Sequence, residues 1–150
     1  MILLVAMNDI LFSAAIFDYD GTLTERSYSS VPPLELRKIL QELSGKIPMA
    51  ICSARTFPQV LEKLAVLLGD RYLELRKYWT LFVENGGAGY FYNASDNESD
   101  NESAFTEFYR AQWPEKLFSR KKFDQLVNNF FMHKVDYISV NQSCYIFRPL

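Results

Sequence analysis

Two carboxylates, one residue apart, follow an apolar run near the start of the chain. Residues 14–17 read Ala-Ala-Ile-Phe, and the acids Asp18 and Asp20 come next. An ionised Asp18 can attack a phosphoryl group and form an aspartyl-phosphate. Asp20 would protonate the leaving oxygen and later deprotonate the water that hydrolyses the intermediate. The spacing therefore indicates phosphoryl-transfer chemistry, and a purely structural role as turn caps is the alternative.

The same segment predicts a cation site and a phosphate site. Two like charges this close need a compensating charge, and Mg²⁺ prefers oxygen ligands. We expect Asp18 to bind Mg²⁺ through its side chain and Asp20 through its backbone carbonyl. Gly21 allows the backbone to turn sharply beside a ligand. The backbone amides of Gly21 and Thr22 could then donate to phosphate oxygens.

Two further apolar runs also end in polar residues. Ser53 follows the second run, and its hydroxyl and nearby amides suit a phosphate oxygen. Arg55 could pair with the phosphate or with the rest of a substrate. Glu84 and Asn85 follow the third run and could orient Arg55, hold a water or form a turn. Helix capping by Ser53 and a surface ion pair of Arg55 are the structural alternatives.

Strands and helices alternate over the first half of the chain, and these elements must position the polar residues. Such alternation predicts an α/β fold, a partial Rossmann-like parallel sheet with helices on both faces. The carboxyl ends of parallel strands lie along one edge, so the three polar ends should share one site. The expected strands are residues 10–17, 47–52 and 80–83, and the expected helices are residues 33–43 and 58–68.

The character of the chain changes after Gly89. We place a domain boundary there, with residues 1–88 as an α/β core and residues 89–150 as part of a smaller α+β region. Residues 95–103 duplicate Asp-Asn-Glu-Ser and predict a solvated loop. The remaining expected elements are a strand at 90–92, a helix at 104–112, a helix at 119–133 capped by Ser119, and a strand or hairpin at 135–147 that turns near Asn141.

Length and composition limit the class of protein. The chain has 150 residues, 49% of them hydrophobic, and a formal net charge of −2. It has no basic surplus of the kind that marks nucleic-acid binding. Residues 1–7 are apolar but too few to span a membrane, and no basic residues precede them as in a signal peptide. Cys52 and Cys144 form no disulfide framework, which favours a reducing, cytoplasmic location.

Three segments resemble motifs of the haloacid dehalogenase-like superfamily of phosphohydrolases. Residues 18–24, Asp-Tyr-Asp-Gly-Thr-Leu-Thr, resemble its first motif, and residues 51–55, Ile-Cys-Ser-Ala-Arg, resemble its second. Residues 83–88, Val-Glu-Asn-Gly-Gly-Ala, resemble a segment of members that carry a large cap after the third strand. Those members include Cof-type sugar phosphatases, sucrose-phosphatases, mannosyl-3-phosphoglycerate phosphatases and phosphomannomutases. The resemblance covers roughly residues 12 to 90.

The resemblance implies a role for each motif residue. Asp18 would be the nucleophile, Asp20 the acid and base, and Ser53 the phosphate binder, with Mg²⁺ as cofactor. Residues 88–150 would begin the cap that selects the substrate. The expected function is hydrolysis of a small phosphorylated metabolite, a sugar phosphate. A phosphomutase, or a non-catalytic module that binds phosphate or a partner chain, is the alternative.

The chain departs from the family pattern in two places. The family has a Lys or Arg that neutralises charge at the nucleophile and an acidic pair that completes the Mg²⁺ site. Lys121 or Lys122 could be proposed for the first, and Asp136 with Asn141 for the second, but none has the expected context. The chain therefore resembles the N-terminal portion of a longer phosphatase. We expect poor catalysis from it alone, and either a complementing C-terminal segment or self-association as its partner.

Overall fold

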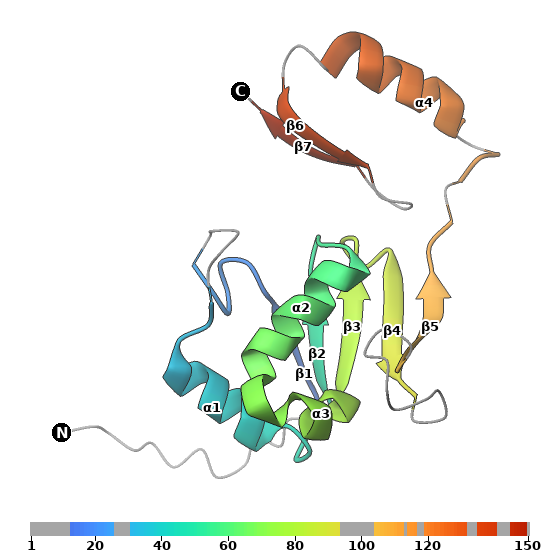
Figure 1. The fold of residues 1–150 in the computed structure, drawn as a ribbon. Coiled ribbons are helices and arrows are strands. Elements are labelled where there is room, and N and C mark those ends of the chain that lie inside the picture. The colour runs from blue at the N-terminus through green and yellow to red at the C-terminus, as the bar shows by residue number, and fades with distance from the viewer. Residues whose placement is uncertain are drawn as a thin grey trace.

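The computed structural model describes residues 13–25, 31–93, 104–112, 114–116, 119–131, 135–140 and 145–149. Five strands form one mixed sheet in the order β1-β2-β3-β4-β5 (Figure 1). The first three strands pair in parallel, and the last two continue the sheet antiparallel. The α/β fold class is confirmed. The strands are β1 (Ala15–Asp18), β2 (Met49–Cys52), β3 (Trp79–Val83), β4 (Ala88–Tyr92) and β5 (Phe105–Arg110).

Two helices connect the parallel strands, as expected from the sequence. Helix α1 (Leu34–Leu43) follows Pro33, whose fixed φ suits a helix start. Helix α2 (Phe57–Leu68) begins after Thr56, whose backbone N–H donates to Gln59 Oε1 at 3.0 Å. The chain then forms short helical turns before β3, including α3 (Tyr72–Leu75). These turns were not predicted, because Gly69 and Asp70 indicated only the end of α2.

The helices cover one face of the sheet and form the core with it (Figure 1). Leu64 of α2 is fully buried there, as are Ile51 of β2 and Leu81 of β3. Trp79 is also buried and donates its indole N–H to Ser44 Oγ at 2.9 Å. In the described part of the chain no helix lies against the opposite face, which we call the second face.

The sheet continues past residue 88, where the sequence predicted a domain boundary. β4 pairs with β3, and β5 pairs with β4, so both strands extend the core sheet. The helix expected at residues 104–112 is wrong, because this segment forms β5. The spacing of Phe105 and Phe108 suggested one helix face, but residues three apart lie on opposite faces of a strand, so Phe105 is buried and Phe108 is exposed. The division into residues 1–88 and 89–150 stays a prediction.

The last described elements agree with the predicted helix and hairpin. Helix α4 (Arg120–Leu126) continues as a wider turn over Val127–Phe131. Ser119 caps it, because its hydroxyl accepts from the Lys122 N–H at 3.5 Å. Strands β6 (Val135–Val140) and β7 (Tyr145–Pro149) pair antiparallel as a hairpin. The expected turn at Asn141, the acidic repeat at 95–103 and residues 1–9 lie outside the described residues.

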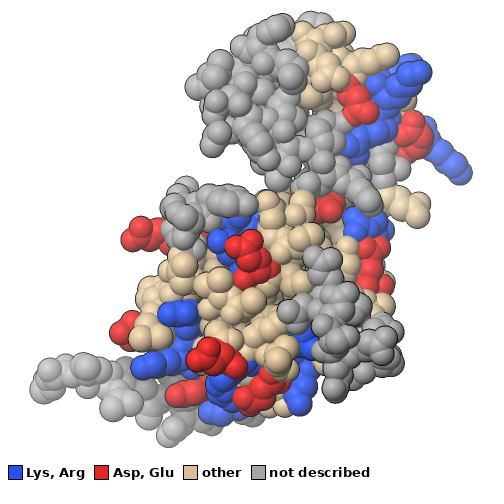
Figure 2. Space-filling view, in the orientation of Figure 1, with Lys and Arg blue, Asp and Glu red and all other residues tan. Residues whose placement is uncertain are grey.

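Charge is mixed over the surface. Figure 2 shows acidic and basic side chains interspersed over the helical layer, and basic residues gathered on the part that carries α4. Lys121 and Lys122 are exposed on that helix. In the described ranges, no helix is both long and apolar enough to cross a bilayer.

Gly89 gives a stability prediction for the sheet. A Cβ at this position would lie 2.7 Å from Cζ of the Phe108 ring, closer than carbon atoms tolerate. We expect Gly89→Ala to lower the free energy of unfolding by about 1–3 kcal/mol, the usual cost of overpacking. In a Phe108→Ala background the same change should cost about 0.5 kcal/mol or less. Urea unfolding of the native chain, the two single variants and the double variant measures both effects. An equal loss of stability from Gly89→Ala in the two backgrounds would contradict the contact with Phe108.

Candidate active site

Asp18 ends β1 at the carboxyl edge of the parallel strands. It pairs with Cys52 of β2 in the sheet register, and its side chain is exposed. One carboxylate oxygen accepts from the Tyr19 N–H at 2.8 Å, and the other accepts from the Thr22 hydroxyl at 3.3 Å. The structure thus holds the expected nucleophile in one orientation and leaves it open to a ligand. Burial, with a smaller effect of Asp18, raises the pKa of the Cys52 thiol, so this thiol stays protonated near neutral pH.

Buried residues hold the loop that follows β1 against the core. The Tyr19 side chain is buried, and burial together with the Asp20 charge raises its pKa to about 12. Its backbone carbonyl accepts from the N–H groups of Leu23 and Thr24 at 3.1 and 3.2 Å. Gly21 takes a φ of 86°, the left-handed conformation that favours glycine. Buried residues therefore fix a tight turn whose exposed tip presents the expected phosphate-binding amides.

Arg55 binds Asp20 in the structure. Its Nε donates to Asp20 Oδ2 at 2.9 Å, and its Nη2 donates to Oδ1 at 2.7 Å. The Arg55 side chain is only 10% exposed. Planar two-point pairs of this kind are stronger and more directional than single contacts. From the sequence, Arg55 was expected to bind the phosphate or the rest of a substrate, or to form a surface ion pair. The sequence did not predict that its partner would be Asp20.

Ser53 lies at the end of β2 and links two loops. Its N–H donates to the Phe82 carbonyl at 2.9 Å, and its carbonyl accepts from the Asn85 N–H at 3.0 Å. Its side chain is buried, and the hydroxyl accepts from the Arg55 N–H at 3.3 Å. The N-cap of α2 is Thr56, so Ser53 does not serve as that cap. These bonds place the Ser53 hydroxyl beside the loops that follow β2 and β3.

The loop after β3 is bound to the loop after β2. The Glu84 N–H donates to the Arg55 carbonyl at 2.9 Å. Glu84 and Asn85 both have positive φ, 54° and 57°. Such backbone conformations cost about 1–3 kcal/mol each in non-glycine residues and occur preferentially at functional sites. Together with the Arg55–Asp20 pair, these bonds bring the ends of β1, β2 and β3 into one site, as the sequence predicted.

A polar network on β4 and β5 supports Glu84, and the sequence did not reveal it. The buried Glu84 carboxylate lies 3.5 Å from Arg110 Nη1. Arg110 also binds Glu107 and donates to the Tyr90 hydroxyl at 2.6 Å. Burial and a hydrogen bond to Glu107 raise the pKa of Tyr90 to about 12, so its hydroxyl stays protonated. The sequence predicted a helix at residues 104–112, which would not pair with β4, so Glu107 and Arg110 were not considered as support for the site.

The site provides oxygen atoms, which are the ligands that Mg²⁺ prefers, but only a few of them are free to bind a metal ion. Among the described residues, no group of three or more His, Cys, Asp or Glu side chains could hold a metal ion. Arg55 takes both carboxylate oxygens of Asp20, which leaves the Asp20 backbone carbonyl as a donor. The exposed Asp18 carboxylate is the second donor. Mg²⁺ usually keeps several waters and takes one or two carboxylates, so these donors fit part of such a site.

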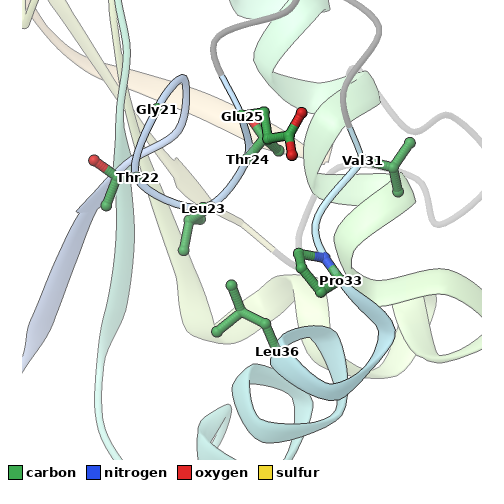
Figure 3. Close-up of a pocket in the computed structure, with 8 residues that line it drawn as sticks. All are labelled: Gly21, Thr22, Leu23, Thr24, Glu25, Val31, Pro33 and Leu36. Carbon is green, nitrogen blue, oxygen red and sulfur yellow. The ribbon is translucent and has the colours of Figure 1, made fainter.

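A hollow of about 700 Å³ lies beside the loop after β1. Figure 3 shows Leu23 and Leu36 facing each other at one side of it, with Glu25 and Val31 at another. This volume is in the range of small-molecule sites. In Figure 1, α4 and the hairpin β6–β7 lie beyond the carboxyl edge of the sheet, on the side of the acids. The lining residues are Gly21, Thr22, Leu23, Thr24, Glu25, Val31, Pro33 and Leu36.

Comparison with known proteins identifies the fold. No family model matches the chain. A protein of Caenorhabditis elegans named "Probable phosphomannomutase" is 32% identical over 113 residues, which are 75% of this chain and 38% of the relative. A haloacid dehalogenase-like hydrolase of Bacteroides thetaiotaomicron is 18% identical with a TM-score of 0.56, and the match covers 91% of this chain and 44% of that one.

A crystal structure of a Thermotoga maritima protein has a TM-score of 0.55 at 14% identity, and the match covers 91% of this chain and 42% of that one. The chain thus spans less than half the length of each of these proteins. The resemblance read from the three motifs is confirmed, and the chain has the fold of the haloacid dehalogenase-like superfamily.

Proposed function

We propose that this chain carries the phosphoryl-transfer site of a phosphomonoester hydrolase that acts on a small phosphorylated metabolite, a sugar phosphate. One observation supports this proposal most. The exposed Asp18 carboxylate lies at the carboxyl edge of the sheet, and the neighbouring loops hold Asp20, Ser53 and Arg55 at the same edge. An accessible carboxylate nucleophile beside a second carboxyl group matches the requirement of a two-step hydrolysis.

The first step forms an aspartyl-phosphate. One Asp18 oxygen attacks phosphorus while the bond from phosphorus to the leaving oxygen breaks. The Thr22 hydroxyl, 3.3 Å from Asp18 Oδ2, keeps the carboxylate oriented for this attack. Asp20 gives a proton to the leaving oxygen. Because Arg55 now holds both Asp20 oxygens, this ion pair must open or share one oxygen before Asp20 reaches the substrate.

The second step hydrolyses the intermediate and needs the same residues. Asp20 takes a proton from a water, which attacks phosphorus and releases inorganic phosphate and free Asp18. The Ser53 hydroxyl and the amides of Gly21 and Thr22 donate to phosphate oxygens, and Asn85 lies beside Ser53 to extend this set. Mg²⁺, held by the Asp18 carboxylate and the Asp20 carbonyl, would supply positive charge that offsets the charge of the phosphate.

A phosphomutase is the second candidate, and the C. elegans relative favours it. In a mutase the phosphoryl group on Asp18 would return to a sugar rather than pass to water. Both reactions share the first step, so the residues of this site fit either one. The fate of the phosphoryl group separates them.

Phosphorus NMR of the protein with mannose 6-phosphate and Mg²⁺ tests the proposal. We expect slow growth of the inorganic phosphate signal, because the Arg55 guanidinium is held by Asp20 rather than by Asp18. The signal should be lost on addition of EDTA, which removes Mg²⁺. Growth of a sugar 1-phosphate signal in place of free phosphate would assign the mutase reaction. No change in either signal, with phosphate binding retained in a titration, would assign the chain to a binding module and contradict the proposal.

A further inference from the structure

Three consecutive residues after β3 have left-handed backbone conformations. The φ angles of Glu84, Asn85 and Gly86 are 54°, 57° and 81°. Because the first two are not glycines, neighbouring groups must hold them in this conformation. The turn directs two N–H groups to the loop after β2, where Glu84 donates to the Arg55 carbonyl at 2.9 Å and Asn85 donates to the Ser53 carbonyl at 3.0 Å. The positions of Ser53 and Arg55 therefore depend on the shape of this turn.

The loop after β2 in turn determines where two groups of the candidate site lie. Ser53 carries the hydroxyl expected to bind phosphate. Arg55 holds the carboxylate of Asp20 through two hydrogen bonds of 2.9 and 2.7 Å. A displacement of about 1 Å at a reacting centre can slow catalysis by about 10²-fold. A change in the shape of the turn after β3 would thus move the phosphate binder and the expected acid together.

The Glu84 side chain connects this turn to the end of β5. Its carboxylate lies 3.5 Å from Arg110 Nη1, and the side chain is only 9% exposed. Arg110 Nη1 is also buried and donates no hydrogen bond to a described residue, so the contact is an ion pair. Removing one partner of a buried ion pair leaves the other charge uncompensated, which is strongly destabilising. The Arg110 guanidinium therefore stabilises the charged form of Glu84 within the turn.

Groups on β4 and β5 fix the position of Arg110. Its Nη2 donates to the Tyr90 hydroxyl at 2.6 Å, and its Nε donates to both carboxylate oxygens of Glu107 at 3.0 Å. These hydrogen bonds from Arg110 lower the pKa of Glu107, so this carboxylate stays charged at neutral pH. Val83 pairs with Ala88 and Ala88 pairs with Arg110, so the ends of β3 and β5 lie at the same edge of the sheet (Figure 1).

We propose that Arg110 is a positioning residue of the phosphoryl-transfer site. It holds Glu84, and the turn at Glu84 places the Ser53 hydroxyl and the pair of Arg55 with Asp20 for the phosphate. Arg110 acts through Glu84 and does not itself bind the reacting groups. This role rests on the proposed function, because it assigns what the network on β4 and β5 does for that reaction.

A purely structural role for Arg110 makes a different prediction. If Arg110 only joins β4 to β5, its loss should weaken the whole sheet, and the charge of Glu84 should not matter. If Arg110 positions the turn, its loss leaves a buried carboxylate uncompensated, and the turn should open locally. Removal of the charge from Glu84 should then reverse most of the effect. The two roles differ in where the change occurs and in its dependence on Glu84.

Hydrogen exchange and phosphoryl capture in Arg110→Gln test the proposal. The amides of Glu84 and Asn85 should exchange at least about tenfold faster than in the native chain, because their turn opens locally. The amides of β2, which lies between two paired strands, should keep their exchange rates. Capture of the phosphoryl group from acetyl phosphate with Mg²⁺, followed by mass, should slow by about 10–10²-fold. Arg110→Lys keeps the positive charge and should recover part of both losses.

Two further variants make the test specific. The double variant Glu84→Gln/Arg110→Gln has neither charge, so both rates should return to within about threefold of the native values. Arg71→Gln is the matched control, because Arg71 also binds a glutamate three positions away, Glu74, at 2.7 Å, but is 45% exposed on the turns after α2. This control should leave both rates unchanged. Circular dichroism and urea unfolding check that every variant folds.

Three results in the variants would each overturn the positioning role and leave the proposed function standing. They are native exchange at Glu84 and Asn85 in Arg110→Gln, a double variant no better than Arg110→Gln, and capture at the native rate while the turn opens. A loss of protection shared equally by the amides of β2 would assign Arg110 the purely structural role instead. Absence of capture by the native chain is a separate result, because it contradicts the proposed function and the positioning role with it.

Discussion

Asp18→Asn should abolish phosphoryl capture by this protein. With acetyl phosphate and Mg²⁺, the native chain should gain the mass of one phosphoryl group, and the variant should gain none. Phosphate release should fall at least about 10³-fold, because an amide is not a nucleophile and no second group replaces it. The amide keeps nearly the same shape, so the hydrogen bonds from Tyr19 and Thr22 can still form on its oxygen.

Hydroxylamine makes this experiment specific for the attacking group. It cleaves an acyl phosphate on Asp18 but not a phosphate ester on Ser53, so the adduct of the native chain should be lost on treatment. Asp70→Asn is the control, since this carboxylate is exposed on the turn after α2, away from the site. An adduct that survives hydroxylamine, or one that forms equally in Asp18→Asn, would contradict the assignment.

Asp20→Asn should separate substrates by their leaving groups. A sugar alkoxide must be protonated as it leaves, so transfer from a sugar phosphate to Asp18 should slow by about 10²–10⁴-fold. A nitrophenolate leaves without help, so transfer from p-nitrophenyl phosphate should slow much less. Because Asp20 also activates water, the phosphorylated chain should accumulate with that substrate. Rapid-quench mass spectrometry of both reactions measures the two rates.

Arg55→Ala controls for the loss of the ion pair. Asp20→Asn weakens the pair with Arg55 as well as removing an acid, whereas Arg55→Ala breaks the pair and keeps the Asp20 carboxyl group. Arg55→Ala should therefore affect both substrates alike, because no proton donor is lost. If Asp20→Asn also slowed both substrates by one common factor, Asp20 would be a structural partner of Arg55 rather than an acid.

The sequence by itself determined the acids, the turn and the class of fold. Asp18, Gly21 and Thr22 are consecutive parts of one strand and one tight turn, and such local geometry follows from neighbouring residues alone. Helices α1 and α2 were predicted nearly to their ends, because apolar periodicity and capping residues are also local. The gathering of three strand ends then followed from parallel pairing.

Only the tertiary structure decided which polar groups meet at the site and which surface is left open. Arg55 and Asp20 are 35 positions apart, and Glu84 meets Arg110 across two further strands. Nothing in the local pattern chooses among the possible ion pairs, because the choice depends on strand order and register. Residues 105–110 likewise form a strand where a helix was expected, and strand alternation places Phe105 in the core and Phe108 on the second face. Long-range pairing energy, which no short segment contains, overrode the local preference there.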